Sequence, residues 1–272
     1  MTIPYNGSIF LMSNNLEAIL LAGGSGSRLM PFTTYTSKHL LPIDNVPMIF
    51  YPLKNLQLIG VKVVYLIINK EHYEQWNALI SRYDFKMKIE LIIQDLPKGI
   101  PHAMKCCEKY IKNDQFIVSL GDNVIISSMF LNKFRKEMIN KNNSLICGFH
   151  VNDPTPFGVA AFDKSQNLIE VIEKPNNPPS NIAIAGFYKF PKKVFLEIEK
   201  LKFSDRGELE ISDLINKYIK SNSCDFLSNN SHSDFWIDTG THDALIRATN
   251  FIRDLKNNTG NKYAQFDLID DN

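Results

Sequence analysis

The stretch that most constrains the fold is an apolar run that ends in a loop rich in glycine and serine. Residues 16–22 (LEAILLA) are almost entirely apolar, and residues 23–28 (GGSGSR) follow directly. A short apolar run with no polar face predicts a strand buried on both sides. Glycines leave backbone N–H groups accessible, and successive N–H groups at a strand end bind anions. Because Arg28 and Lys38 add positive charge nearby, we interpret the loop as a polyphosphate site.

Two widespread phosphate-binding loops fit this stretch poorly. A dinucleotide-binding loop, G-x-G-x-x-G, needs a third glycine at the position of Leu29. A P-loop ends in Gly-Lys-Ser or Gly-Lys-Thr, and no such triplet closes the segment. A tight turn without any ligand is an alternative for the loop considered alone.

The rest of the chain alternates predicted strands with predicted helices. In the first half, strands are predicted at 61–68, 88–93 and 115–120, and helices at 47–60, 71–82 and 101–112. In the second half, a helix at 129–141 precedes short strands at 144–149, 158–162, 168–172 and 182–190, helices at 193–201 and 209–220, a strand at 235–237 and a helix at 242–256. This alternation predicts an α/β protein, a Rossmann-like three-layer α/β/α fold with a mixed, mainly parallel central sheet. Such sheets bind ligands beyond the carboxyl ends of their strands.

Composition narrows the kinds of partner and compartment. The 272 residues carry a formal net charge of +1, so no strong field attracts nucleic acid or an acidic membrane surface. No apolar run approaches the roughly 20 residues that span a bilayer, and residues 1–15 lack the basic start of a secretory signal. The four cysteines contain no C-x-x-C pair, so we expect reduced thiols in a cytoplasmic protein.

The glycine-rich loop is part of a longer motif. Residues 21–29 read LAGGSGSRL, 37–38 read SK and 41–42 read LP. This pattern resembles the opening motif of the sugar-1-phosphate nucleotidyltransferases, and within them most closely that of the glucose-1-phosphate thymidylyltransferases. Further matching segments extend to Thr241. The resemblance implies transfer of a nucleotidyl group from a nucleoside triphosphate, with dTTP favoured, to a sugar-1-phosphate, with glucose-1-phosphate favoured, and release of pyrophosphate.

Two aspartates follow predicted strands. Asp122 lies in the segment 121–123 (GDN), and Asp238 lies in 236–241 (WIDTGT). Each aspartate alone is most often a turn former, and Thr241 suits the cap of the last helix. The resemblance implies that both carboxylates hold a Mg²⁺ ion, which takes one or two carboxylates together with phosphate oxygens and water.

Two further segments indicate how the substrates bind. Residues 173–175 (EKP) end a predicted strand, where a Glu-Lys pair is ordinarily solvated surface, whereas the resemblance implies contact with the sugar phosphate. Residues 94–103 (QDLPKGIPHA) match the loop that reads the base, and a glutamine amide suits the imide edge of thymine or uracil. Pro101 and His102 replace the alanine and glutamine expected in a thymidylyltransferase, and the His-Ala pair is similar to the uridylyltransferase branch. The choice between dTTP and UTP therefore stays open, and we interpret His102 as a helix-start residue.

The resemblance assigns a role to each matching residue. The catalytic set is Arg28, Lys38, Asp122 and Asp238, and the metal ligands are Asp122 and Asp238. The nucleotide-binding set is Leu21, Ala22, Gly23, Gly24, Ser25, Gly26, Ser27, Arg28, Gln94, Gly99 and Asp122. The sugar-phosphate-binding set is Asn123, Gly158, Glu173, Lys174 and Ile184. Glu208 and Glu210 lie in another matching segment, 206–213 (RGELEISD), but they suit the first turn of a helix and are left out.

The predicted organisation is one nucleotidyltransferase domain at 16–257, with a nucleotide-binding half at 16–125 and a sugar-binding half at 126–257. Residues 1–15 are interpreted as an N-terminal extension and 258–272 as a polar tail. The expected partners are a nucleoside triphosphate and a sugar-1-phosphate, without nucleic acid or a membrane, and a homo-oligomer is left open.

Two other functions compete with this prediction. A Rossmann oxidoreductase needs the missing third glycine and an acidic ribose partner roughly 20 residues further on. A catalytically silent sugar-nucleotide sensor on the same fold would be expected to lose at least one of the four residues of the catalytic set, and all four are present.

Overall fold

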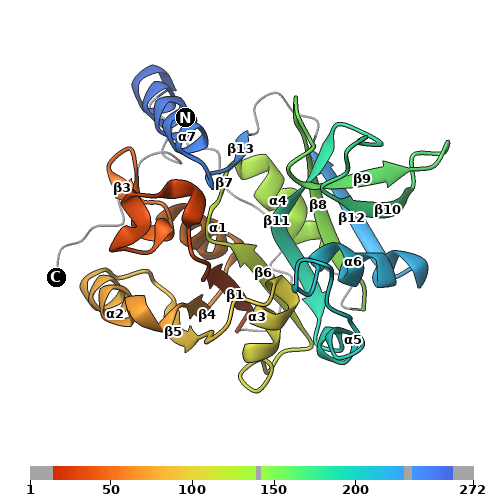
Figure 1. Ribbon diagram of the computed structural model, residues 1–272, viewed down its shortest axis with the longest axis horizontal. Helices are drawn as coiled ribbons and strands as arrows, with labels where there is room; N and C mark the ends of the chain where they lie inside the picture. Colours follow the sequence, from red (N-terminus) through yellow and green to blue (C-terminus); the bar gives the residue numbers. More distant parts are fainter. Residues whose placement is uncertain (1–14, 139–141, 230–234, 260–272) are drawn as a thin grey trace, which may run out of the picture.

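The computed structural model describes residues 15–138, 142–229 and 235–259. A nine-stranded sheet lies at its centre in the order β10-β9-β11-β6-β1-β4-β5, with β8 beside β11 and β12 beside β8 (Figure 1). Its strands are β1 (Glu17–Ala22), β4 (Val63–Ile68), β5 (Lys88–Ile93), β6 (Gln115–Leu120), β8 (Ser144–His150), β9 (Gly158–Phe162), β10 (Leu168–Glu173), β11 (Ile182–Pro191) and β12 (Cys224–Asn229). Two small sheets pair β2 (Pro42–Ile43) with β3 (Val46–Pro47) and β7 (Asn123–Ile126) with β13 (Phe235–Asp238).

Most strands of the large sheet run in one direction. β1 pairs in parallel with β4 and β6, β4 with β5, and β8 with β12. β11 pairs antiparallel with β6, β8 and β9, and β10 pairs antiparallel with β9. β10 and β11 therefore oppose the other seven strands, which confirms the predicted mixed, mainly parallel sheet.

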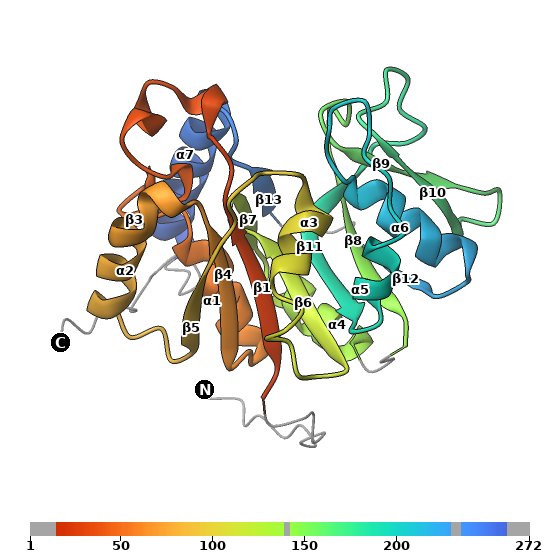
Figure 2. The same cartoon turned by 60° about the horizontal axis from the view of Figure 1, so that its bottom comes forward.

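Helices cover both faces of this sheet. They are α1 (Phe50–Ile59), α2 (Tyr73–Arg82), α3 (Ile100–Cys106), α4 (Ser128–Glu137), α5 (Val194–Ile198), α6 (Ile211–Lys220) and α7 (His242–Thr259). One apolar cluster contains side chains of α1, α2, α4 and α7, including Phe50, and a second contains side chains of α3, α5 and α6, including Phe195. Figure 2 shows α3, α5 and α6 in front of the sheet. The three-layer prediction is confirmed.

Strand β1 is buried on both sides, as its apolar sequence predicts. Leu20 belongs to the first cluster and the adjacent Ile19 to the second, because successive side chains of a strand point to opposite faces. Its one acid, Glu17, is also buried. The Glu17 carboxylate accepts hydrogen bonds from the backbone N–H groups of Lys112 and Asn113 at 2.9 and 2.8 Å, which offsets the cost of burying its charge.

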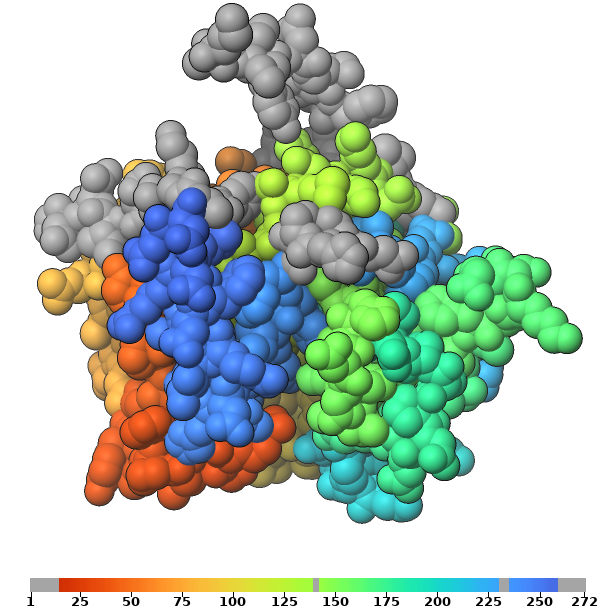
Figure 3. Space-filling model, turned by 90° about the horizontal axis from the view of Figure 1, so that it is seen from above, coloured from red at the N-terminus to blue at the C-terminus, as the bar shows by residue number. Residues whose placement is uncertain are grey.

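Several helix ends follow local signals. α1 stops at Gly60, whose φ of 99° is readily adopted only by glycine, and the Gly60 N–H donates to Leu56 and Gln57. Thr241 Oγ1 accepts from the Ala244 N–H at 3.2 Å, so the interpretation of Thr241 as a cap is confirmed. α7 then lies along the segment that follows the glycine-rich loop (Figure 3), where Lys256 Nζ is 2.6 Å from Asp44 Oδ2.

The structure differs from the sequence prediction at several elements. α3 ends at Cys106, earlier than predicted, because the next residues form tight turns such as the bond from Tyr110 N to Cys107 O. The strands β2, β3, β7 and β12 were not predicted, since they are very short or, for β12, polar and at a sheet edge. The last part of the predicted helix 129–141, residues 139–141, lies outside the described residues.

The structure describes little of the predicted N-terminal extension and C-terminal tail. Residues 1–14 of the predicted extension and 260–272 of the predicted tail lie outside the described residues, and the boundaries of the predicted domain stay predictions. Among the described residues, none of the helices combines the length and the apolar character needed to cross a bilayer.

Candidate active site

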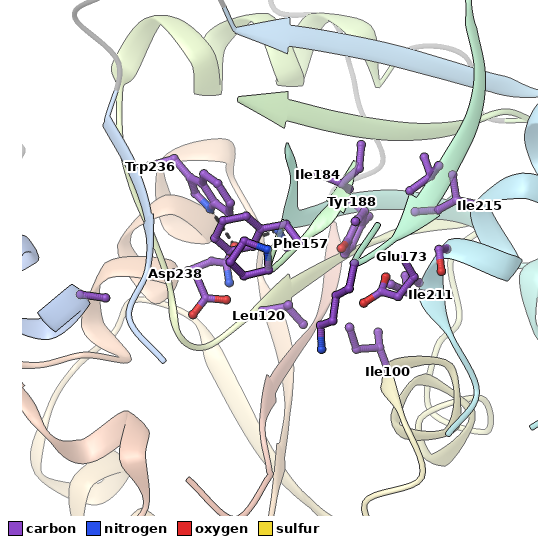
Figure 4. Close-up of a pocket in the computed structure, with 18 of the residues that line it drawn as sticks. Ile100, Leu120, Phe157, Glu173, Ile184, Tyr188, Ile211, Ile215, Trp236 and Asp238 are labelled. Atoms are coloured by element: carbon purple, nitrogen blue, oxygen red, sulfur yellow. Dashed lines mark hydrogen bonds between the residues drawn. The ribbon is translucent and has the colours of Figure 1, made fainter. Parts of the chain in front are cut away.

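Two adjoining cavities open beyond the carboxyl ends of the central strands. The first, here called the glycine-loop cavity, has a volume of about 220 Å³ and lies where β1, β5 and β6 end. The second, called the Glu173 cavity, has a volume of about 290 Å³ and extends from the end of β6 toward β9, β10 and α6 (Figure 4). Ile100 and Leu120 line both, so the two cavities meet at these residues.

Asp122 and Asp238 are brought together by the pairing of β7 with β13. Asp238 lies opposite Asn123 in this ladder, and the Thr239 backbone N–H donates to the Asp122 carbonyl at 2.9 Å. Burial, and then the charge of Asp122, raise the pKa of Asp238 to about 6. Burial also disfavours an ionised Asp122, but the Lys38 ammonium outweighs it and holds the pKa of Asp122 well below its usual range. The fold thus keeps two carboxylates close together.

Gly240 lies between the Asp238 carboxylate and the Arg28 guanidinium. A Cβ atom on Gly240 would lie 2.8 Å from Asp238 Oδ1 and 2.8 Å from Arg28 Nη2, closer than real Cβ contacts. The Gly240 N–H also donates to Asp238 Oδ1 at 2.8 Å. On the other side, Lys38 Nζ forms an ion pair with Asp122 Oδ2. Positive groups therefore lie beside both aspartates.

The donor set suits a divalent cation that is shared with a ligand. Two carboxylates held together against their repulsion are stabilised by a cation, and oxygen atoms are what Mg²⁺ prefers. Within the described residues, no group of three or more His, Cys, Asp and Glu side chains could hold a metal ion by itself. The remaining ligands would therefore come from substrate oxygens and water.

Glu173 and Lys174 lie at the end of β10, beside the Glu173 cavity. Glu173 pairs with Gly158 of β9, and burial raises its pKa. Lys174 has a φ of 44°, a left-handed conformation that costs a non-glycine residue about 1–3 kcal/mol. The Lys174 N–H donates to the Phe157 carbonyl at 2.9 Å, which helps to hold this conformation. Such strain is concentrated at functional sites.

Asn123 connects the strands around the Glu173 cavity. Its Oδ1 atom accepts from Trp236 Nε1 and from the Gly186 N–H, each at 2.8 Å, and its Nδ2 atom donates to Asp122 Oδ1 at 3.0 Å. The Trp236 ring in turn packs edge-on against Phe157, with ring centroids 5.1 Å apart. Figure 4 shows these two rings beside Asp238, across the cavity from Glu173.

Comparison with known proteins shows the family to which the chain belongs. The model of the nucleotidyl transferase family matches residues 17–255. The chain belongs to this family. Its relatives include glucose-1-phosphate thymidylyltransferases of Neisseria gonorrhoeae, 34% identical over 89% of this chain and 84% of the relative, and of Xanthomonas campestris pv. campestris, 35% identical over 90% and 83%. The family resemblance found in the sequence is confirmed.

Solved structures of nucleotidyltransferases share its fold. A Bacillus anthracis structure, titled as that of a glucose-1-phosphate thymidylyltransferase in complex with sucrose, superposes with a TM-score of 0.81 at 36% identity, covering 91% of this chain and 98% of that one. A UDP-glucose pyrophosphorylase in complex with UDP-glucose has a TM-score of 0.73 over 88% and 98% at 22% identity, which shows a common fold.

The structure of this nucleotidyltransferase gathers most of the predicted site residues. Those that line the glycine-loop cavity are Leu21, Gly23, Gly24, Lys38, Gln94, Gly99 and Asp122. Those that line the Glu173 cavity are Arg28, Asn123, Gly158, Glu173, Lys174, Ile184 and Asp238. Among the described residues, four of the nucleotide-binding set line neither cavity, namely Ala22, Ser25, Gly26 and Ser27. Ala22 is buried within β1, and Ser25 and Ser27 are exposed.

Other cavity residues were not predicted. Ile211 and Ile215 of α6 line the Glu173 cavity, but their spacing is also that of an ordinary core-facing helix. Arg206 Nη2 lies 2.5 Å from Glu210 Oε2 and 3.6 Å from Glu173 Oε1. The matching segment 206–213 contains the signal for this cluster, although Glu208 and Glu210 also suit a helix start. Glu210 does immediately precede α6, and it also pairs with Arg206.

Proposed function

We propose that this protein transfers a nucleotidyl group from a nucleoside triphosphate to a sugar-1-phosphate, with dTTP and glucose-1-phosphate as the favoured substrates. The observation that carries the proposal is the meeting of two cavities beside Asp122 and Asp238, with Arg28, Lys38 and Lys174 around them. The similarity to glucose-1-phosphate thymidylyltransferases supports the choice of substrates. UTP is the alternative, because a glutamine amide fits uracil as well as thymine.

In this reaction an oxygen of the sugar phosphate attacks the α-phosphorus of the triphosphate. A new oxygen–phosphorus bond forms, the bond from the α-phosphorus to the bridging oxygen breaks, and pyrophosphate leaves with that electron pair. No side chain has to act as a nucleophile or general base, because a phosphate monoester is largely ionised at neutral pH. The protein's task is to align two anions and to offset their charge.

The positive side chains divide this task. The triphosphate lies in the glycine-loop cavity and extends toward Arg28, which lines the adjoining Glu173 cavity, with Lys38 on the pyrophosphate side. Lys38 exchanges its ion pair with Asp122 for one with the phosphates, which releases the Asp122 carboxylate. Asp122 and Asp238 would then hold Mg²⁺, which supplies positive charge to the phosphate oxygens when bound. Lys174 neutralises the sugar phosphate, and Glu173 accepts hydrogen bonds from sugar hydroxyls.

A substrate panel tests this function. The purified protein is incubated with glucose-1-phosphate, Mg²⁺ and one of dTTP, UTP, dCTP, dATP or GTP, and pyrophosphate release is measured. We expect release with dTTP or UTP, and the triphosphate with the higher kcat/KM is the preferred substrate. Absence of release with every triphosphate, although the protein is folded and binds dTTP, would favour the sensor hypothesis.

Lys174→Ala is expected to raise the KM for glucose-1-phosphate more than that for the triphosphate. Loss of one oriented charged contact costs about 3 kcal/mol, or roughly a hundredfold in kcat/KM. Steady-state kinetics with each substrate varied in turn measures this split. Lys164→Ala removes an exposed lysine from the β9–β10 turn and serves as the control. Equal increases in both KM values would contradict the proposed role of Lys174.

We also propose a cytoplasmic location. Cys106, Cys107, Cys147 and Cys224 are all free thiols in the structure, which suits a reducing compartment. A homo-oligomer stays a prediction.

A further inference from the structure

A hydrogen bond at the edge of the glycine-loop cavity joins Gln94 to His102. Gln94 Nε2 lies 3.0 Å from His102 Nδ1. We propose that His102 is a positioning residue, which fixes the orientation of the Gln94 amide and so makes the cavity select thymine or uracil over cytosine. This inference rests on the proposed function.

Both partners are held in place by the fold. Gln94 follows β5, is 7% exposed, and donates its backbone N–H to the Ile68 carbonyl at 3.0 Å. His102 lies in the first turn of α3, where the interpretation of it as a helix-start residue is confirmed. The adjoining glycine-rich loop is also fixed, because Asn69 Nδ2 donates to the Gly24 carbonyl at 3.0 Å and Asn69 Oδ1 accepts from the Gly24 N–H at 3.3 Å. The hydrogen bond therefore joins two groups of defined position.

The protonation state of His102 follows from its surroundings, and its tautomer follows from the atom of the Gln94 amide that it faces. Burial, and then the charge of Lys98, lower the pKa of His102, so the ring is neutral at neutral pH. A neutral imidazole has one acceptor nitrogen, and the nitrogen that faces the Gln94 amino group must be that acceptor. His102 Nδ1 accepts, and the ring proton lies on Nε2.

This bond has a consequence for the free side of the amide. A glutamine amide can turn by 180° with little change in shape and then present either its oxygen or its amino group. With Nε2 bound to His102, Oε1 lies toward Gly23, where a Cβ atom would be only 3.2 Å from it. Gly23 and Gln94 both line the glycine-loop cavity. The amide therefore offers a fixed acceptor on that side.

The pyrimidine bases differ in what they present to such an acceptor. Thymine and uracil have an N3–H donor beside the O4 acceptor, whereas cytosine has an N3 acceptor beside an N4 amino donor. The Oε1 atom accepts from the N3–H of thymine or uracil, but would face a lone pair of cytosine. An unpaired buried polar group costs about 1–3 kcal/mol, so the fixed amide disfavours cytosine by roughly tenfold or more.

Two substitutions at one position separate this role from a packing role. His102→Leu keeps a similar volume but removes the acceptor. His102→Asn keeps an oxygen on Cγ, where Nδ1 is attached in histidine. The measurement is kcat/KM for dTTP, UTP and dCTP at saturating glucose-1-phosphate. We expect His102→Leu to lower the preference for dTTP over dCTP by about tenfold, and His102→Asn to retain most of it, while the KM for glucose-1-phosphate is unchanged in both.

A His102→Leu variant with the wild-type preference for dTTP over dCTP would overturn the inference, as would an equal loss of preference in both variants. Should His102→Leu not fold, His102→Ala makes the same comparison, since alanine is well tolerated in a helix. Calorimetric titration with dTTP and dCTP in the absence of sugar keeps the test separate from catalysis. If the wild type releases no pyrophosphate but binds dTTP more tightly than dCTP, and His102→Leu loses this difference in binding, the proposed function fails while the inference about His102 stands. Equal binding of the two nucleotides would overturn the inference itself.

Discussion

Replacing Asp238 by asparagine is expected to lower Mg²⁺-dependent turnover at least about a hundredfold while the protein stays folded. Asparagine has nearly the same shape, and its oxygen can still accept the Gly240 N–H that now binds Asp238 Oδ1 at 2.8 Å. What is lost is the second of two neighbouring carboxylates, and with it the negative charge that would hold a divalent cation against the phosphates. Pyrophosphate release measured over a range of Mg²⁺ concentrations checks this, and added Mg²⁺ is expected to restore little of the activity.

An exposed aspartate on α7 provides the matched control. Asp254→Asn changes the net charge by the same amount, away from both cavities. Its turnover is expected to equal that of the wild type. Wild-type turnover in Asp238→Asn would remove Asp238 from the metal site, and equal losses in the two variants would attribute the effect to net charge.

The same substitution is expected to stabilise the fold at neutral pH. The pKa of Asp238 is about 6 in the folded protein, above the value near 3.9 expected for the unfolded chain. The folded state therefore binds more protons than the unfolded state between these values, and the free energy of unfolding falls as the pH rises through them. Asparagine does not ionise, so Asp238→Asn avoids this fall in the free energy of unfolding. Asp238→Asn is therefore expected to be more stable than the wild type at about pH 7, and to differ little from it below about pH 4. Denaturant unfolding at the two pH values measures the gain, and a variant less stable at neutral pH would contradict it.

Gly99→Ala is expected to destabilise the fold and disrupt the glycine-loop cavity. Gly99 has a φ of 95°, and a Cβ atom there would lie 2.2 Å from the Leu209 carbonyl oxygen and 2.9 Å from its nitrogen. Both are backbone atoms, and the Leu209 N–H donates to the Lys98 carbonyl at 3.0 Å. An alanine at position 99 therefore forces the backbone around Gly99 away from the backbone around Leu209. We expect the free energy of unfolding to fall by about 2–4 kcal/mol, the sum of backbone strain and overpacking. The KM for the triphosphate is expected to rise with it.

Gly60 offers a control with the same backbone conformation. Its φ is 99°, but no heavy atom lies within 4 Å of the position of its Cβ. Gly60→Ala therefore adds only backbone strain, about 1 kcal/mol, and leaves the cavities intact. Denaturant unfolding and triphosphate kinetics are measured on both variants. The difference between them is the effect of the close approach of residue 99 to the Leu209 backbone. Equal losses of stability in the two variants would show that Leu209 moves away at no cost.

Much of the fold could be predicted because its signals are local. The strands β5, β6 and β9 have the predicted bounds, since each is a short apolar run between turn residues. α1 ends where Gly60 allows a left-handed turn. By contrast, β12 reads CDFLSN and is recognised only by its pairing with β8, a contact between residues about 80 positions apart. Periodicity carries no information about such a partner.

In the candidate site, too, local motifs could be predicted and contacts between distant residues could not. Sequence motifs located Asp122 and Asp238, but their meeting depends on the β7–β13 ladder between distant segments. The bond between Gln94 and His102 and the approach of Arg206 to Glu173 are contacts between side chains whose positions follow from the packing of whole elements. Residue type and spacing alone cannot specify them.

The β7–β13 ladder also bears on the synthesis of the protein. Asp122 is translated in the first half of the chain, whereas Asp238 is translated only after all nine strands of the large sheet. A ribosome that stalls between residues 126 and 238 leaves a nascent product with the strands from β1 to β7 but only one of the two carboxylates. With the role proposed for Asp238, turnover begins only once translation has passed residue 238 and its segment has docked, so we expect truncated products to be inactive however well their first half folds.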